Sequence, residues 1–339
     1  MNIGVVGYGY WGSKHARVMC SVPGVSVTII ESDDRRRAAA AAAFPMARTA
    51  ADLDEALPKL DGIVVATPPG SHASIGMRAL EAGVHVMVEK PLARSMRDAE
   101  TMVELAAQRN LVLMVGHTFE YNPAVLWLKG AFDRGELGDL YYLDSARRNL
   151  GLHQRDVNVI WDLAPHDISI ANFLLGENPT SVRALGTDYS GTGQIDVAHV
   201  SLVYPSGVTA YIHVSWLDPS KVRKLTAVGS AKMVEYDDMR ADEPIRLFDK
   251  GITVGESRPQ DMPLSYRHGD IVSPFVAYQE PLQLEDSHFV ECVAGHATCR
   301  TPGSSGLEVM RVLEASDVAL ATGREVRIEP ATIGTLVPA

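Results

Sequence analysis

The sequence contains little of what marks a disulfide-bonded, membrane-bound or nucleic-acid-binding protein. Its 339 residues include only three cysteines, which form neither a Cys-x-x-Cys pair nor a disulfide framework and so favour a reducing compartment. No apolar run is long enough to span a bilayer. The apolar start Met1–Val6 carries neither the basic segment nor the cleavage site of a secretory signal. We therefore expect a cytoplasmic protein.

Positive charge is also scarce, because 42 acidic residues outnumber 31 lysines and arginines and give a net charge of -11. Overall charge of this sign argues against a nucleic-acid or anionic-membrane partner. Metal-binding patterns are missing too, with no His-Glu-x-x-His and no cysteine cluster, so we expect no metal. The chain is 46% hydrophobic and long enough for two domains, and a small molecule is its expected partner.

Short apolar runs alternate with helical segments over the first third of the chain, which is typical of βαβ units and a parallel sheet. The continuous apolar character of these runs suits strands that are buried on both faces. The predicted strands are Ile3–Val6, Val25–Ile30, Ile63–Ala66, Val84–Val88 and Leu111–Val115, and the predicted helices are Ser13–Cys20, Arg35–Ala43, Leu53–Leu57, Ser71–Ala82 and Met96–Gln108. We expect an α/β fold with a Rossmann dinucleotide-binding domain over residues 1–118.

After residue 118, short alternating runs separated by tight turns indicate an antiparallel sheet. The predicted strands are Val182–Thr187, His199–Val203, Thr209–Ser215, Leu225–Gly229, Lys232–Tyr236 and Ile245–Phe248, and the predicted helices are Pro123–Asp133, Asp167–Leu175, Glu285–Cys292 and Ser305–Thr322. Residues 119–339 are therefore expected to form an α+β domain on an open, mostly antiparallel sheet. A sheet face without helices would suit a homodimer or homotetramer interface.

The most specific local motif is Gly7-Tyr8-Gly9-Tyr10-Trp11-Gly12, which follows the first predicted strand and opens a helix. Gly7 permits a tight turn, Gly9 lets the backbone approach a pyrophosphate, and Gly12 lets the helix pack close to the sheet. The helix N-terminus then offers N–H groups to the phosphates. Candidate cofactor-binding residues are Gly7, Gly9, Tyr10, Trp11 and Gly12, and the alternative is a glycine-rich turn without a nucleotide.

Glu31 ends the second predicted strand, where the carboxylate that binds the adenosine ribose is expected. A carboxylate repels a 2′-phosphate, so NAD is the expected cofactor. Arg35, Arg36 and Arg37 leave NADP open, since an arginine there can accept that phosphate, although a solvated helix face is the preferred explanation for them.

Three further predicted strands end in polar residues, namely Thr67-Pro68 with His72 beyond, Glu89-Lys90-Pro91, and Gly116-His117-Thr118. Ligands of open α/β sheets lie at the carboxyl ends of the strands, so these segments should share one edge with the glycine loop. Lys90 at that edge can exchange the proton of a substrate hydroxyl or polarise its oxygen. The alternative for Lys90 is a solvated charge.

Asp162 and His166 form a second candidate pair, since a spacing of four residues places them on one face of a helical turn. Histidine titrates near neutrality and a carboxylate can orient it, which suits proton transfer. Pro165 fits the first turn of the helix predicted to follow. The alternatives are a helix cap for Asp162 and a core histidine for His166; a third ligand for a metal is not evident.

Basic residues recur near this pair and could bind a carboxylate or phosphate, although each one alone is explained equally well as a solvated charge. They are Arg147, Arg148, Arg155, Lys221, Arg223 and Lys224. Tyr121 and Asn122 follow the last Rossmann strand and are candidates for substrate contact or for interdomain packing.

In combination, Gly7–Gly12, Thr67-Pro68 with His72, Glu89-Lys90-Pro91, and Asp162 with His166 resemble the glucose–fructose oxidoreductase/inositol dehydrogenase family over nearly the whole chain. The resemblance implies reversible oxidation of a sugar or cyclitol hydroxyl with NAD or NADP. It implies catalytic roles for Lys90, Asp162 and His166, cofactor contacts from Thr67, Pro68, His72, Glu89 and Lys90, and a cis peptide bond before Pro91 as in some relatives. Pro69 departs from the commonest family form, which has asparagine there.

A narrower resemblance concerns members that act at C3 of nucleotide-linked sugars, including UDP-N-acetylglucosaminuronate 3-dehydrogenases. It rests on Gly116–Pro123, Asn149–Gly151 and Asp156–Asp167. The substrate-binding residues that it implies are Lys90, Tyr121, Arg147, Arg155, Asn158, Asp162 and His166.

The expected function is therefore an NAD-dependent sugar dehydrogenase in which Lys90 and His166 contact the reacting hydroxyl and Asp162 orients the histidine. The sequence does not decide whether Lys90 or His166 exchanges the proton. Two alternatives stay open: a dehydrogenase of free inositol or aldose, and a nucleotide-binding sensor that has lost the chemistry.

Overall fold

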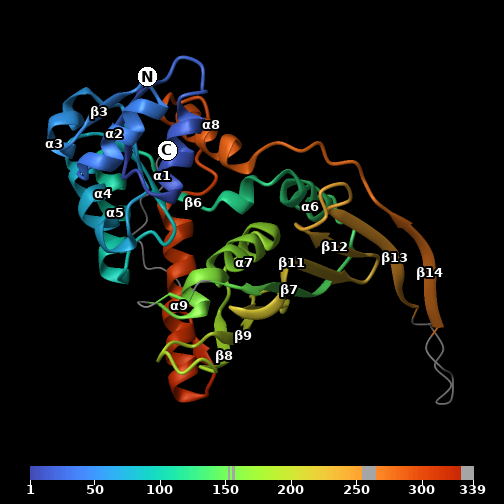
Figure 1. The fold of residues 1–339 in the computed structure, drawn as a ribbon. Coiled ribbons are helices and arrows are strands. Elements are labelled where there is room, and N and C mark those ends of the chain that lie inside the picture. Colours follow the sequence, from blue (N-terminus) through green and yellow to red (C-terminus); the bar gives the residue numbers. More distant parts are fainter. Residues whose placement is uncertain (152, 155–156, 254–264, 330–339) are drawn as a thin grey trace. The chain divides into compact units, whose positions relative to one another are not determined.

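The computed structural model describes residues 1–151, 153–154, 157–253 and 265–329, which divide into two compact units (Figure 1). Residues 1–121 and 279–310 belong to unit 1, and residues 122–278 and 311–329 belong to unit 2. The chain thus leaves unit 1 after Tyr121 and returns to it at Gln279. The sequence predicted one boundary, at residue 118, and did not predict this return. The third crossing, after Met310, lies within helix α9 (Gly303–Thr322).

Unit 1 is built on a parallel sheet, here named sheet A, as the sequence predicts. Among the described residues its strand order is β3-β2-β1-β4-β5-β6, and every neighbouring pair is parallel. The strands are β1 (Asn2–Val6), β2 (Ser26–Ile30), β3 (Arg48–Ala50), β4 (Gly62–Val65), β5 (His85–Glu89) and β6 (Leu113–Gly116). This order reverses direction between β1 and β4, the point at which doubly wound sheets bind their ligands.

Sheet A is apolar on both faces, which explains its continuous hydrophobic strands. Successive residues point to opposite faces, so Ile63 and Val65 join one core cluster while Val64 of the same strand joins the other. The helices of unit 1 are α1 (Tyr10–Met19), α2 (Asp34–Ala43), α3 (Leu53–Ala56), α4 (His72–Glu81), α5 (Met96–Arg109) and α8 (Pro281–Val293), with short 3-10 turns η1 (Leu57–Lys59), η2 (Pro69–Ser71) and η3 (Thr118–Tyr121). Phe289 of α8 is fully buried in the second cluster, so the returning segment completes the core of unit 1.

Unit 2 is built on an open, mostly antiparallel sheet, here named sheet B, again as predicted. Its order over the described residues is β14-β13-β12-β11-β7-β10-β9-β8-β15, and only the β10–β7 pair is parallel. The strands are β7 (Leu140–Leu150), β8 (Ser181–Thr187), β9 (Val197–Val203), β10 (Thr209–Ser215), β11 (Leu217–Gly229), β12 (Met233–Asp237), β13 (Ile245–Thr253), β14 (Ser265–Val272) and β15 (Val326–Arg327), and α6 (Pro123–Asp133) precedes them. The sequence pattern did not predict β3, β7, β14 or β15.

Helix α7 (Val159–Leu175) packs on β7 and β10, and it starts earlier than predicted. The sequence placed Pro165 in the first turn of a helix beginning near Asp167, but Pro165 lies in the helix interior. Asn158 is the N-cap, because its side-chain oxygen accepts the backbone N–H groups of Ile160 and Trp161 at 3.0 and 3.2 Å. A proline inside a helix sacrifices one backbone hydrogen bond, and packing of the apolar helix on sheet B offsets that loss.

Among the helices of the described residues, none combines the length and the apolar character that a bilayer crossing needs.

Candidate functional site

A cleft of about 930 Å³ lies along the carboxyl ends of β1, β2 and β4 in unit 1. It brings together seven of the predicted cofactor-binding residues: Gly7, Gly9, Tyr10, Trp11, Glu31, Thr67 and Pro68. Parallel strands put their carboxyl ends on one edge, so segments from residues 7 to 68 meet in one place.

The three glycines of the motif have different steric environments. Gly7 has φ +91°, a conformation that glycine adopts without strain. A Cβ on Gly12 would lie 1.9 Å from the carbonyl oxygen of Gly7, so only glycine lets α1 approach the strand-end turn this closely. A Cβ on Gly9 would meet no described atom within 4 Å. The space next to Gly9 therefore belongs to the cleft, and it is where the motif expects a pyrophosphate.

Helix α1 points its N-terminus at this space. Its N-cap is Gly9, which has no side chain to satisfy the first backbone N–H groups. The amides of a helix N-terminus and its positive dipole end favour a bound phosphate. The geometry of the cleft thus fits a dinucleotide, in agreement with the role expected from the sequence.

Glu31 is fixed by the turns beside it and is only 7% exposed. Its Oε2 accepts the Tyr8 N–H at 2.8 Å, and its Oε1 accepts the Asp33 N–H at 2.9 Å. Of the three neighbouring arginines, Arg36 lines the cleft with Nη1 4.0 Å from Glu31, while Arg37 donates to the carbonyl oxygen of Glu31. The carboxylate is therefore preorganised at the cleft wall, and Arg36 is the arginine that an NADP-binding mode would use.

His72 does not line the cleft but joins two strand-end loops. Its Nε2 lies 2.8 Å from the carbonyl oxygen of Thr67, and its Nδ1 lies 2.8 Å from that of Pro91. The ring is 1% exposed, and burial lowers the pKa of His72, so the neutral ring donates to one carbonyl at a time. His72 therefore holds together the loops that carry Thr67 and Lys90.

Lys90 follows β5 directly, is half-buried, and is joined to Pro91 by a cis peptide bond, as the resemblance implies. Glu89 before it is opposite Gly116 of β6, so His117 lies at the same edge of sheet A. His117 is 2% exposed, and neither ring nitrogen has a hydrogen-bond partner among the described residues. Burial, opposed by Glu89 and reinforced by the positive charge of Lys90, lowers the pKa of His117 to about 4. The lysine therefore stands beside a neutral histidine.

In unit 2, α7 carries two of the three predicted catalytic residues, Asp162 and His166, and both are half-buried. They share one helix, as their spacing suggests, but Asp162 is not its cap: its backbone N–H donates to Asn158. Its Oδ2 accepts the indole N–H of Trp216 at 2.9 Å, and that ring is 1% exposed. Trp216 thus holds the carboxylate on the turn before His166.

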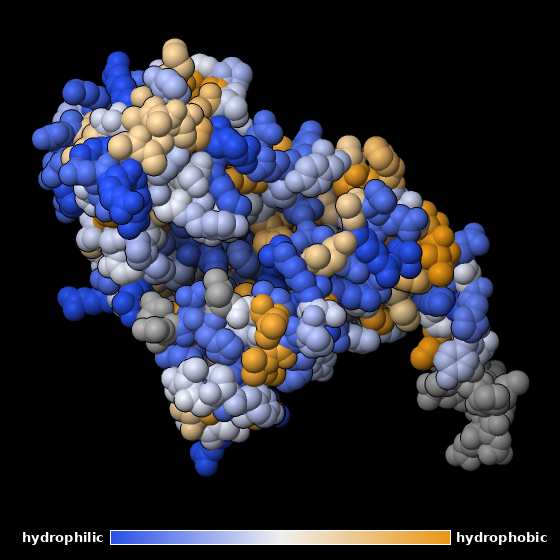
Figure 2. Space-filling view, viewed as in Figure 1, coloured by the Kyte–Doolittle hydropathy of each residue, from blue (hydrophilic) through white to orange (hydrophobic). Residues whose placement is uncertain are grey.

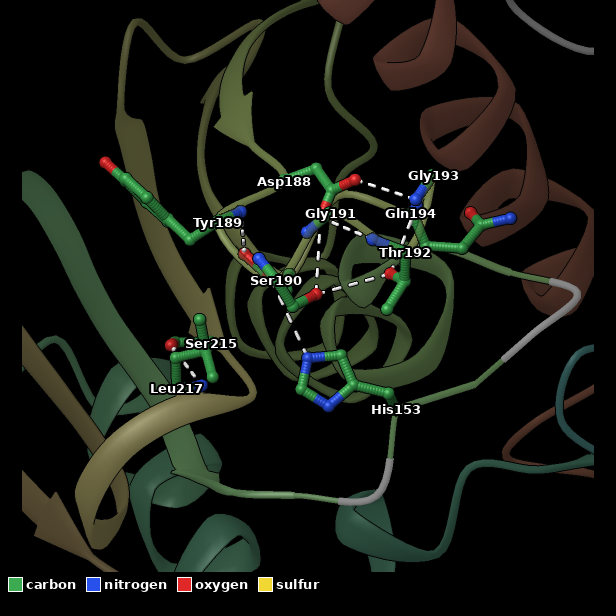
Figure 3. Close-up of polar contacts among 11 residues, drawn as sticks. His153, Asp188, Tyr189, Ser190, Gly191, Thr192, Gly193, Gln194, Ser215 and Leu217 are labelled. Atoms are coloured by element: carbon green, nitrogen blue, oxygen red, sulfur yellow. Dashed lines mark hydrogen bonds and ion pairs between the residues drawn. The ribbon is translucent and has the colours of Figure 1, made fainter.

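A polar loop cluster of unit 2 lies next to Trp216, whose ring centroid is 5.2 Å from that of His153. His153 Nε2 is 3.7 Å from the fully buried Asp196. Asp188 closes the loop, because its carboxylate accepts the N–H groups of Gly191, Thr192 and Gly193 (Figure 3). Figure 3 shows the His153 ring beneath this turn. Trp216 and His153 were not predicted from the sequence, since a lone Trp and a lone His carry no spacing signal.

The remaining predicted substrate residues have other partners. Tyr121 is 1% exposed in the core of unit 1, with its hydroxyl 3.3 Å from that of Thr301, which favours packing over substrate contact. Arg147 is 5% exposed and donates Nε–H to Asp167 at 2.7 Å. Asn158 caps α7 and donates its amide to Asp317. Arg155 lies outside the described residues.

No cluster of three or more potential metal ligands occurs in the part of the chain that the structure describes.

Comparison with known proteins identifies relatives of both units. Residues 1–117 match GFO_IDH_MocA, an oxidoreductase family with an NAD-binding Rossmann fold, and residues 125–235 match the GFO/IDH/MocA C-terminal domain. UDP-N-acetylglucosamine 3-dehydrogenase of Acidithiobacillus ferrooxidans is 26% identical over 311 residues, 91% of this chain and 94% of the relative. scyllo-Inositol 2-dehydrogenase (NAD(+)) of Bacillus subtilis is 26% identical over 312 residues, 87% of this chain and 86% of the relative.

Among solved structures, GenD2 from gentamicin A biosynthesis, in complex with NAD, has the same fold. It superposes with a TM-score of 0.81 at 24% identity and covers 97% of both chains.

Gly9→Ala and Gly12→Ala should separate binding from folding. Gly12→Ala should lower the free energy of unfolding by about 1–3 kcal/mol or more, because the new Cβ collides with the Gly7 carbonyl. Gly9→Ala should change that free energy by less than about 1 kcal/mol. It should nevertheless weaken NADH binding by about tenfold or more, since the methyl group occupies the cleft. Denaturant unfolding measures the free energy of unfolding, and fluorescence titration measures NADH affinity. Equal effects of the two variants on both quantities would contradict the different surroundings of Gly9 and Gly12.

His117 should make the protein less stable in acid. Its pKa is about 4 when folded and about 6.5 when unfolded, so its contribution is present above pH 6.5 and is lost as pH falls toward 4. Between about pH 8 and pH 5, His117→Phe should lose about 2 kcal/mol less of its unfolding free energy than the wild type. Equal pH dependence of the two proteins in chemical denaturation would show that His117 is not held neutral.

Proposed function

Because the chain belongs to the Gfo/Idh/MocA oxidoreductase family, we propose that it oxidises a sugar ring hydroxyl, or reduces the ketone, at C3 of a nucleotide-linked sugar or sugar uronate. NAD is the proposed cofactor, because Glu31 presents a fixed carboxylate where a 2′-phosphate would lie. The observation that carries the proposal is the open space at Gly9, bounded by the N-terminus of α1 and sharing its sheet edge with Lys90.

The nicotinamide, when bound, accepts or donates the hydride. Lys90 hydrogen-bonds the reacting oxygen, and its ammonium group stabilises negative charge that develops there. His166 exchanges the hydroxyl proton, and Asp162, held by Trp216, keeps the imidazole in position. The two proton-transfer roles of Lys90 and His166 can be exchanged within this proposal.

Support for a nucleotide-linked substrate comes from the similarity to the 3-dehydrogenase of A. ferrooxidans. Arg147 and Arg148 add less than the sequence suggested, because they pair with Asp167 and Asp218 inside unit 2. The equal identity to an inositol dehydrogenase supports a second candidate, oxidation of a free cyclitol.

A screen over a panel of substrates tests the proposal. The wild-type protein is assayed for NADH or NADPH formation with nucleotide-linked sugars, sugar uronates, free aldoses and inositols, and ketosugar reduction runs in parallel. Turnover with NAD that is confined to nucleotide-linked sugars is the expected result. Turnover of inositols or aldoses would select the second candidate, and NADH binding without turnover would favour a sensor.

Lys90→Met should reduce kcat by about 10²- to 10⁴-fold, because the reacting oxygen loses its cationic partner. The affinity for NADH should stay within about twofold, since the binding energy of the cofactor comes mainly from the glycine loop and Glu31. Lys59→Met, which removes an exposed lysine of the same unit, is the control and should retain wild-type turnover. Near-normal turnover of Lys90→Met would remove Lys90 from the mechanism.

We also propose that the chain forms a homodimer or homotetramer through the face of sheet B opposite α7. This face has a cavity of about 510 Å³ lined by residues such as His199, His213 and Tyr211. Leu185 and Tyr211 on it are 70% and 48% exposed. Apolar side chains are also exposed at the edge strands β13 and β14 (Figure 2), where the consecutive residues Ile271 and Val272, which point to opposite faces of the sheet, are 55% and 53% exposed. Exposed apolar surface of this kind marks interaction sites.

Tyr211→Asp should therefore shift the protein toward monomers in light scattering, because it buries a charge in the interface. Tyr189→Asp is the control, since Tyr189 is exposed in a loop and points away from the polar cluster in Figure 3. A monomeric wild-type protein at assay concentration would contradict the interface.

A further inference from the structure

His15 lies on α1, the helix whose N-terminus borders the nucleotide cleft, and it is fully buried between two carboxylates. Its Nδ1 lies 2.8 Å from Asp286 Oδ1, and its Nε2 lies 3.1 Å from Glu89 Oε1. The three residues come from α1, the end of β5 and α8, so the segment that returns to unit 1 supplies one member.

Both nitrogens of His15 need a proton if both contacts are hydrogen bonds to carboxylates, which makes the ring an imidazolium. Burial opposes that charge, but Asp286 and Glu89 outweigh it and hold the pKa of His15 well above its ordinary value. Asp286 accepts from His15 with Oδ1, and its other oxygen has no hydrogen-bond partner among the described residues.

The contacts continue to the proposed catalytic lysine. Glu89 accepts from His15 with Oε1, and its Oε2 accepts the backbone N–H of Lys90 at 3.1 Å. Glu89 is thereby held at both oxygens, and the chain Asp286–His15–Glu89 ends on the backbone of Lys90.

We propose that Asp286 and His15 are positioning residues for Lys90: they lock Glu89, and Glu89 fixes the strand end that presents the lysine. This inference rests on the proposed function and extends it to a residue far from the motifs, on helix α8. Replacing a buried ion pair by apolar side chains is often neutral or stabilising, so packing alone gives little reason for three charged groups in this core. Their contact with the backbone of Lys90 supplies a reason.

Other titratable groups surround the chain of contacts formed by Asp286, His15 and Glu89. Glu285 is fully buried and accepts the Thr118 hydroxyl, and burial and the charge of Glu89 raise its pKa well above the usual range, which favours the neutral form. His117, directly after β6, lies close enough to Glu89 and Lys90 for both charges to affect its pKa. Arg17 and Glu280 pair with each other at the partly exposed edge of the α1–α8 contact. Within this set, Asp286 contacts His15 directly, and its charge also raises the pKa values of Glu285 and Arg17.

Asp286→Asn tests the inference because it keeps the shape and removes the charge. In the NADH-bound wild type, His15 should titrate well above its ordinary pKa, and in the variant it should lose its proton at a lower pH, because the Asp286 carboxylate no longer stabilises the imidazolium. The ring signal in NMR, assigned with His15→Gln, reports this. Hydrogen exchange of the peptide containing Lys90 should accelerate by about tenfold or more in the variant.

Kinetics supply the functional measurement. In Asp286→Asn, kcat should fall by about tenfold or more while NADH affinity stays within about twofold. The loss should increase as pH rises through the new titration of His15, because the neutral ring no longer donates to both partners. His15→Gln should show the loss without the new titration step, and it serves as the second variant if Asp286→Asn does not fold. Glu280→Gln removes a carboxylate from the start of the same helix and should leave all measurements unchanged.

Two results would overturn the inference: titration of His15 near its ordinary pKa in the wild type, or unchanged Lys90 exchange in Asp286→Asn. If the wild type turns over no sugar in the screen, the proposed function fails. The NMR titration and the exchange of Lys90 still decide the inference in that case, because neither needs turnover.

Discussion

The parallel pairing of sheet A is the constraint on which the rest of the candidate site depends. Parallel strands end on the same edge, so the glycine turn after β1, Glu31 after β2, Thr67 after β4 and Lys90 after β5 come together although they are spread over more than eighty residues. The same pairing needs helices on both faces, and these bury the apolar residues of β1, β2, β4, β5 and β6. One face remains incomplete until α8 returns from beyond unit 2 and buries Phe289 against it.

That return does more than cover the sheet, because α8 brings Asp286 and Glu285 beneath the ends of β5 and β6. Buried charges are expensive unless they are paired, and here one imidazole contacts two carboxylates. These buried charges lie next to the backbone of Lys90, the lysine that the proposed chemistry needs. His72 acts at the same edge by a different contact, between the carbonyl groups of Thr67 and Pro91. The edge is thus held from within unit 1 by two histidines, of which only His72 belongs to a sequence motif.

Elements with a strong local signal were predicted well, and the exceptions have physical causes. The five predicted Rossmann strands exist because burial on both faces leaves a continuous apolar run. The three-residue edge strand β3 has no such run, since Arg48 and Thr49 face solvent. Strand β7 was missed because its buried positions include Ser145 and Arg147, which Asp167 of α7 satisfies. Helix α7 was predicted to start too late, because a proline usually marks a helix start, whereas Asn158 caps the helix two turns earlier.

The sequence by itself determined the α/β class, the glycine turn, the acidic strand end and the family, because each is encoded in residues close together in the chain. Only the tertiary structure decided which of these residues face the cleft and which hold others in place. It put His72 behind the loops, Tyr121 in the core and Arg147 in an ion pair, and it joined Asp286 to His15 across 271 positions. Such contacts depend on how separate helices and strands pack, and no local pattern records a partner that lies so far away in the sequence.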